Sequence, residues 1–143
     1  MKNEVIKDMI KEAKIAMKNA YVPVTHHGVG ASVLTKKGNI HKGANVQSVI
    51  SGLGTCAERA AIDNMVSNGE YSIQAVCVVS NSFIYPCGAC LQYIGEFSEI
   101  SGKNIPIIMA NSAGKHKIKY LHELFPHVYG PLESHKNIKK YKK

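Results

Sequence analysis

Three cysteines and one glutamate are the residues of this chain whose types and spacing are best suited to chemistry. Cys56 and Glu58 lie in the segment TCAERAA, and Cys87 and Cys90 lie in YPCGACLQY. Each segment is typical of the start of a helix, where the partial positive charge of the backbone favours thiolate over thiol. Three thiolates at two helix starts form a soft, compact site of the kind that zinc occupies, with a fourth position free for water. The spacing therefore predicts a catalytic zinc site with Cys56, Cys87 and Cys90 as ligands.

Glu58 has two interpretations that its local sequence leaves open. Thr55 and Glu58 have the spacing of a capping box, in which the glutamate accepts a hydrogen bond from a backbone N–H at the start of a helix. Beside a zinc ion with an open position, the same carboxylate can instead take a proton from water and deliver it elsewhere. Cys-x-Glu combined with Pro-Cys-x-x-Cys is the pattern of zinc nucleobase deaminases, so we expect Glu58 to be catalytic.

The elements that must position these residues follow from hydrophobic periodicity and turn chemistry. The pattern predicts an amphipathic helix over 3–20 and a β-hairpin over 29–46, with its turn at Gly38 and Asn39. It also predicts two further helices over 55–69 and 87–100, two buried strands over 73–80 and 105–110, and an edge strand over 116–121. Helices that alternate with buried strands imply a three-layer α/β domain with a mixed sheet, and the two later helices should begin above one end of it. Phe83 and Tyr85, just before the last helix, are interpreted as core residues.

The sequence resembles the cytidine deaminase family, in its small homotetrameric nucleoside form. The resemblance extends over nearly the whole chain, from AYVPVTHHGVGASVLTKKGNIHKGANV through TCAERAA and PCGACLQYIGEF to LFPHVYGP. It implies an αβα sandwich around a five-stranded mixed sheet, and hydrolysis of cytidine or deoxycytidine with release of ammonia, as in pyrimidine salvage. It assigns zinc to the three cysteines, proton transfer to Glu58, and hydrogen bonds to the thiolates to Arg59. Zinc with three thiolates carries a net charge of −1, which a guanidinium would partly offset.

The same resemblance assigns substrate contacts and shows two departures from the family pattern. Backbone groups near Ala57 would contact the pyrimidine, and Asn45 with residue 47 would hold the ribose hydroxyls. Gln47 stands where the family has glutamate, and His27 stands where it has phenylalanine. Tyr129 matches an aromatic residue that reaches the pocket of a neighbouring subunit, with ordinary C-terminal packing as the alternative. These departures motivate a second hypothesis, a deaminase of a modified cytosine nucleoside or of a cytosine-bearing antibiotic of the blasticidin type, which a related family member deaminates.

Length and charge limit the remaining possibilities. At 143 residues we expect a single deaminase-like domain over 1–130 and a basic tail over 131–143, which contributes much of the net charge of +8. The tail lacks the ordered alternation of basic and aromatic residues that binds single strands, which argues against a nucleic-acid partner. The absence of a long apolar run or a signal peptide predicts a cytoplasmic protein without a membrane partner. A structural zinc module of an RNA-binding protein is the non-enzymatic alternative; it needs a fourth permanent ligand, and no histidine or further cysteine lies near the three.

Overall fold

A computed structural model describes residues 1–130 and 136–142 of the chain. The predicted helices and strands are present, and the first helix ends at Met17, three residues earlier than expected. The elements are α1 (Asn3–Met17), β1 (Gly30–Thr35), β2 (Ile40–Ala44), α2 (Ala57–Ser67), β3 (Ile73–Ser80), α3 (Gly88–Ser101), β4 (Pro106–Asn111), β5 (His116–Tyr120), α4 (Leu121–Leu124) and a short 3₁₀ helix, η1 (Lys139–Tyr141).

The five strands form one mixed sheet in the order β2-β1-β3-β4-β5. Only β3 and β4 are parallel, and the other neighbours are antiparallel. Parallel strands need a crossover connection, and α3 supplies it between β3 and β4. The expected α/β fold around a five-stranded mixed sheet is therefore confirmed.

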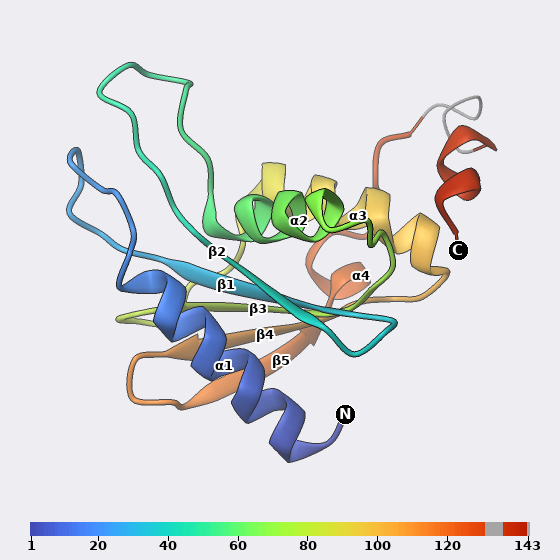
Figure 1. Cartoon of the computed structure of the whole chain (residues 1–143), viewed down its shortest axis with the longest axis horizontal. Helices are drawn as coiled ribbons and strands as arrows, with labels where there is room; N and C mark the ends of the chain where they lie inside the picture. The colour runs from blue at the N-terminus through green and yellow to red at the C-terminus, as the bar shows by residue number, and fades with distance from the viewer. Residues whose placement is uncertain (131–135, 143) are drawn as a thin grey trace.

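Helices cover both faces of the sheet. Figure 1 shows α1 on one face and α2 with α3 on the other. Alternate residues of β3 point to opposite faces of the sheet. Cys77 and Val79 pack with α1, whereas Val76 and Val78 belong to the core beneath α2 and α3. This double burial explains why β3 is a continuous apolar run in the sequence.

Two glycines set how closely the helices approach the strands. A Cβ atom at Gly30 in β1 would overlap the carbonyl oxygen of Ala13 in α1. A Cβ atom at Gly43 in β2 would overlap the backbone nitrogen of Ala61 in α2. The second contact matters for the site, because α2 begins at the residue that follows Cys56.

The described part of the predicted tail lies against the domain. Ile138 packs on the core beneath α2 and α3, and the ring of Tyr141 meets that of Tyr71 edge-on, with 5.1 Å between centroids. Residues 131–135 and 143 of the predicted tail lie outside the described residues. Among the residues that are described, no helix has the length and apolar character needed to cross a membrane.

Candidate active site

The predicted metal ligands occupy equivalent places at the starts of α2 and α3. Cys56 is the N-cap residue of α2 and Cys87 is the N-cap residue of α3, and both have extended backbone conformations. Cys90 lies in the first turn of α3. All three sulfurs therefore lie near the positive ends of two helix dipoles, where negative charge is stabilised.

The distances between the sulfur atoms fit a tetrahedral zinc ion. The Sγ atom of Cys87 lies 3.8 Å from that of Cys56 and 3.6 Å from that of Cys90. All three lie within 4.8 Å of one another. Sulfurs about 2.3 Å from a tetrahedral zinc lie roughly 3.8 Å apart, so the three thiols need little rearrangement to hold the ion.

Glu58 lies beside the sulfurs and is almost completely buried, with 3% of its surface exposed. Its Oε2 atom is 3.1 Å from the Sγ atom of Cys90. Burial raises the pKa of Cys90, and the negative charge of Glu58 raises it further. A cation held by the sulfurs would reverse this effect, because it favours the thiolate. The chemistry of the donor set therefore fits a bound metal ion.

Arg59 brings a positive charge to the same group. Its Nη2 atom donates a hydrogen bond to the Sγ atom of Cys56 at 3.3 Å. Hydrogen bonds to the thiols of Cys56 and Cys90 raise the pKa of Arg59 above its ordinary value, so the guanidinium stays charged. Its Nε atom is buried and has no hydrogen-bond partner among the described residues.

The capping interpretation of Glu58 is wrong. The helix begins at Ala57, two residues after Thr55, and its N-cap Cys56 makes no side-chain capping bond. The Thr55 hydroxyl donates instead to the carbonyl oxygen of Cys56 at 3.4 Å. The Glu58 carboxylate is directed to Cys90 instead.

A cavity of about 580 Å³ opens onto this group of residues. Its polar wall contains Cys56, Ala57, Glu58, Arg59 and Cys87. The lining also includes turn and loop residues that precede α2, and Ile84 and Tyr85 from the loop that precedes α3. A volume of this size is typical of small-molecule sites.

Asn45 and Gln47 both line the cavity, and both are hydrogen-bonded to the segment before β1. The Oδ1 atom of Asn45 accepts from the N–H of Val29 at 2.8 Å, and its Nδ2 atom donates to the carbonyl of His27 at 3.0 Å. The Oε1 atom of Gln47 accepts from the N–H of Thr25 at 3.1 Å, and its Nε2 atom donates to the Thr25 hydroxyl at 2.8 Å. Each amide keeps one donor and one acceptor site for a ligand.

Two predicted substrate residues lie away from the cavity of their own chain. The Nε2 atom of His27 is hydrogen-bonded with the Ser80 hydroxyl at 2.9 Å, and His27 is not a lining residue. Tyr129 is 79% exposed and is also outside the lining. The Gln92 side chain holds the backbone of Tyr129 through two hydrogen bonds, of 2.9 and 2.8 Å.

The sequence interpretation missed one aromatic residue of the cavity wall. Tyr85, expected in the core, is 55% exposed and lines the cavity together with Ile84. Its place two residues before Cys87 is the signal that could have identified it.

A family model, curated relatives and a solved structure all match this chain, and all of them concern cytidine deaminases. The family model described as "Cytidine and deoxycytidylate deaminase zinc-binding region" matches residues 3–103, which include the three cysteines and Glu58. A cytidine deaminase of Sporosarcina psychrophila is 37% identical over 111 residues, covering 76% of this chain and 79% of that protein. One from Halalkalibacterium halodurans is 36% identical over 120 residues, covering 82% of this chain and 89% of that protein. The crystal structure of a cytidine deaminase from Burkholderia pseudomallei superposes with a TM-score of 0.79 at 29% identity, covering 90% of this chain and all of that one.

Proposed function

Because the chain belongs to the cytidine and deoxycytidylate deaminase family, we propose that it is a zinc-dependent hydrolase of cytidine or deoxycytidine. The products are uridine or deoxyuridine and ammonia, and the reaction serves pyrimidine salvage. The observation that carries the proposal is the convergence of three sulfurs and a buried carboxylate at one end of the cavity lining, where Cys56, Cys87 and Glu58 line the cavity and Cys90 lies behind them against Glu58.

Cys56, Cys87 and Cys90 would hold the zinc ion. Zinc bound there supplies a Lewis acid that lowers the pKa of a water molecule and leaves one coordination position open. In the part of the chain that the structure describes, no fourth histidine or cysteine joins this cluster, and Glu58 contacts Cys90 without being a fourth member, which disfavours a closed structural site. Arg59 offsets the negative charge of the thiolates through its hydrogen bond to Cys56.

We assign two proton transfers to Glu58. In the proposed cycle its carboxylate takes a proton from the attacking water and transfers it to ring atom N3 of the cytosine. The water oxygen bonds to ring atom C4, and Glu58 then moves the remaining proton of that oxygen to the amine. The bond between C4 and the amine breaks, so that the amine leaves as ammonia and a carbonyl remains. Ala57 is the first residue of α2, and its backbone N–H has no acceptor within the helix, so it is available to orient the base.

The cavity favours an unphosphorylated nucleoside. Recognition of a phosphate group normally uses lysine or arginine side chains. Among the described residues that line the cavity, Arg59 is the only cationic one, and it is engaged with Cys56. Asn45 and Gln47 instead present neutral amides, which suit sugar hydroxyls.

The test compares the native chain with Glu58→Gln, using the absorbance change of cytidine and the zinc content of each protein. The native chain should turn over cytidine with about one zinc per chain. The variant should keep its zinc and lose turnover by roughly 10²- to 10⁴-fold, since general acid–base catalysis contributes about that much. Glu99→Gln, an exposed carboxylate of α3, is the matched control and should behave as native. Full turnover in Glu58→Gln, or a native protein that binds no zinc, would overturn the proposal.

A second substrate class is supported by Gln47. A neutral amide stands at a position where the family has a carboxylate, and both of its polar atoms are already hydrogen-bonded to Thr25. A native protein that holds zinc and leaves cytidine and deoxycytidine unchanged would favour a modified cytosine nucleoside or an antibiotic of the blasticidin type. Sugar-modified and base-modified cytosines would then be assayed in the same way.

We further propose a cytoplasmic homotetramer in which Tyr129 reaches a neighbouring subunit. Exposed apolar side chains beside the cavity support an assembly, namely Val46, Val49, Ile50 and Leu53. The exposed ring of Tyr129, on a backbone held by Gln92, supports a contact outside its own chain. The four cysteines are free thiols, which suits the reducing cytoplasm.

A further inference from the structure

The candidate site contains one aromatic side chain that its predicted chemistry does not use. Among the described residues that line the cavity, Tyr85 is the only aromatic one. More than half of its surface is exposed, although it lies in a loop between two buried elements, β3 and α3. A planar pyrimidine needs a flat surface against which to pack, and stacking on an aromatic ring supplies it.

The position of Tyr85 in the chain restricts which part of a ligand it can meet. It precedes Cys87 by two residues, and two residues span at most about 7 Å. The amine that is hydrolysed must lie at the three cysteines and Glu58, and it is attached directly to the base. Tyr85 is therefore within reach of the base and not only of the sugar.

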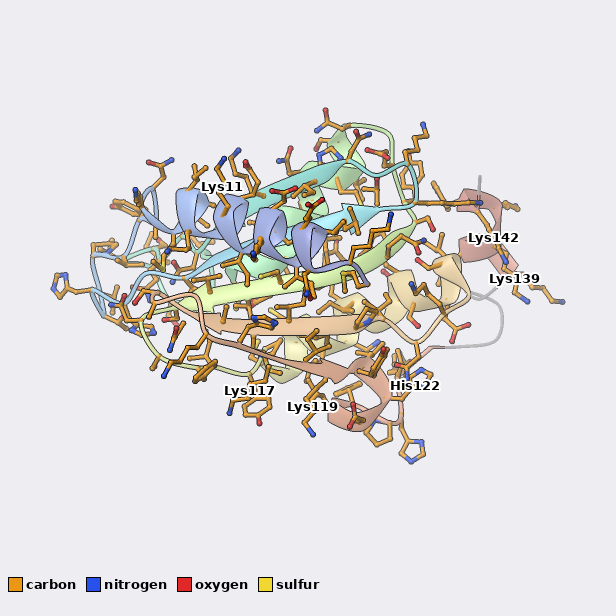
Figure 2. All side chains as sticks on the ribbon, turned by 90° about the horizontal axis from the view of Figure 1, so that it is seen from below. Lys11, Lys117, Lys119, His122, Lys139 and Lys142 are labelled. Carbon is orange, nitrogen blue, oxygen red and sulfur yellow. The ribbon has the colours of Figure 1, made fainter. Side chains whose placement is uncertain are left out.

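Lys117 of the edge strand β5 contacts the aromatic rings of the loop that precedes α3. Its Nζ atom lies 4.8 Å from the ring centroid of Phe83 and 6.0 Å from that of Tyr85. Lys117 pairs with Met109 across β4 and β5, and Figure 2 shows that Lys117 and Lys119 project from β5 away from α1. A cation over one face of the Tyr85 ring holds the ring in place and leaves its opposite face and its edge available to a ligand.

Within the same chain, His27 is the aromatic residue that competes with Tyr85, and its geometry is less suitable. Its ring is hydrogen-bonded to Ser80, a buried residue, and it lies outside the cavity lining. Turning the ring toward the cavity would break that hydrogen bond. Tyr85 needs no such rearrangement.

We propose that Tyr85 is the residue on which the cytosine ring rests, and that Lys117 is a positioning residue that acts through it. The inference rests on the proposed function, because it takes a cytosine nucleoside as the ligand. It assigns specificity for the base to the loop before α3 and leaves specificity for the sugar to Asn45 and Gln47.

The experiment measures the dissociation constant of cytidine by calorimetry on zinc-loaded Glu58→Gln protein, in which the loss of turnover keeps the ligand largely intact during the titration. Adding Tyr85→Ala should weaken binding roughly 5- to 100-fold, the range found when one stacking partner of a base is removed. Tyr85→Phe keeps the ring and should restore affinity to within about twofold. Lys117→Met should weaken binding about 2- to 5-fold, whereas Lys119→Met, two residues along the same strand, should leave it unchanged.

The outcomes separate this inference from the proposed function. If Tyr85→Ala binds cytidine as tightly as its parent while His27→Ala binds it more weakly, the base rests on His27 and the inference is overturned. Equal losses in Tyr85→Ala and Tyr85→Phe would also contradict stacking, because the hydroxyl would then be the contact. In otherwise native protein, Tyr85→Ala should raise KM more than it lowers kcat. Failure of the native chain to bind or deaminate any cytosine nucleoside would overturn the proposed function and this inference together.

Discussion

Individual residues around the three sulfurs determine the net charge of the site in which a metal ion would bind. Three thiols and the Glu58 carboxylate converge within a few ångströms, and Arg59 is the cationic residue that the structure places beside them. Its pKa is raised by its hydrogen bonds to the thiols of Cys56 and Cys90, so its charge does not change over the working pH range of an enzyme. Its role is therefore constant electrostatic support for the ligands.

Removal of that charge should weaken the metal site. Arg59→Gln is expected to lower zinc affinity or turnover by about 10- to 100-fold, the usual cost of losing a partner of a metal ligand. Zinc retention during titration with a chelator and the cytidine assay measure the two effects separately. Lys119→Gln removes a charge elsewhere and should retain native zinc binding. Unchanged zinc retention and turnover in Arg59→Gln would contradict this role.

At the scale of elements, the site depends on how α2 is seated against the sheet. Cys56, Glu58 and Arg59 all belong to the start of α2, and Gly43 of β2 allows the helix backbone to approach the strand closely. The other half of the site begins α3, which crosses from β3 to β4. The distances between the sulfurs are thus set by two helix–sheet contacts.

Gly43→Ala should separate α2 from β2 and disturb the site. The added methyl group would overlap the backbone of Ala61, which cannot move without shifting the helix. We expect a loss of about 1–3 kcal/mol in the free energy of unfolding, typical of overpacking, together with reduced zinc content. Urea unfolding measures the first quantity and metal analysis the second. Gly28→Ala, whose methyl group would make only ordinary contacts, is the control. Native stability in Gly43→Ala would show that α2 can be displaced freely.

A second contact joins the end of α2 to the β1–β2 hairpin. The Glu70 carboxylate accepts hydrogen bonds from the Thr35 hydroxyl at 2.7 Å and the Asn39 amide at 3.0 Å, and it pairs with Nε2 of His41 at 2.7 Å. Burial alone would raise the pKa of Glu70. Its hydrogen bonds with His41, Thr35 and Asn39 outweigh burial and lower the pKa from 4.5 to about 2.

This lowered pKa predicts how stability depends on pH. A carboxyl group with a pKa lower in the folded than in the unfolded state stabilises the fold above the unfolded value and loses that contribution as it is protonated. The contribution of Glu70 should therefore be complete above about pH 4.5 and decline toward pH 2. Glu70→Gln should lower the free energy of unfolding by about 1–3 kcal/mol at pH 7, and the difference from native should shrink over that interval. Urea titrations at several pH values test this, and a difference independent of pH would contradict it.

At the scale of the whole molecule, apolar surface beside the cavity supports the proposed assembly. Leu53 is 70% exposed in the loop before α2, and Tyr129 projects from a backbone held to α3 by Gln92. Exposed apolar groups that gather on one face are typical of an interface between subunits.

Light scattering after size exclusion should give four times the chain mass of 15.6 kDa. Leu53→Asp should shift the population toward smaller species, because burying a charge in an apolar contact is costly. Ile118→Asp places the same charge on β5, at an exposed residue that lines a hollow together with Val5 and Asp8 of α1, and should keep the native mass. A native chain that remains monomeric at all concentrations would contradict the proposed tetramer.

The sequence by itself determined the elements and predicted a group of chemically suited residues that the structure brings together. Cys56, Glu58, Cys87 and Cys90 could be predicted as such a group because ligand chemistry depends on residue type and because spacing along a helix is local. The run at 73–80 identified β3 for the same reason, since burial on both faces leaves a local pattern.

Tertiary structure alone decided how the surrounding side chains are used. It directed Glu58 to Cys90 instead of a capping bond, held Gln47 against Thr25, engaged His27 with Ser80, and placed Tyr85 in the cavity wall. These residues lie in loops or at helix ends, where no periodic pattern in the sequence indicates which way a side chain points. Their orientation depends on hydrogen bonds and packing between segments distant in sequence, such as the contact between His27 and Ser80, and such contacts exist only once the sheet has formed.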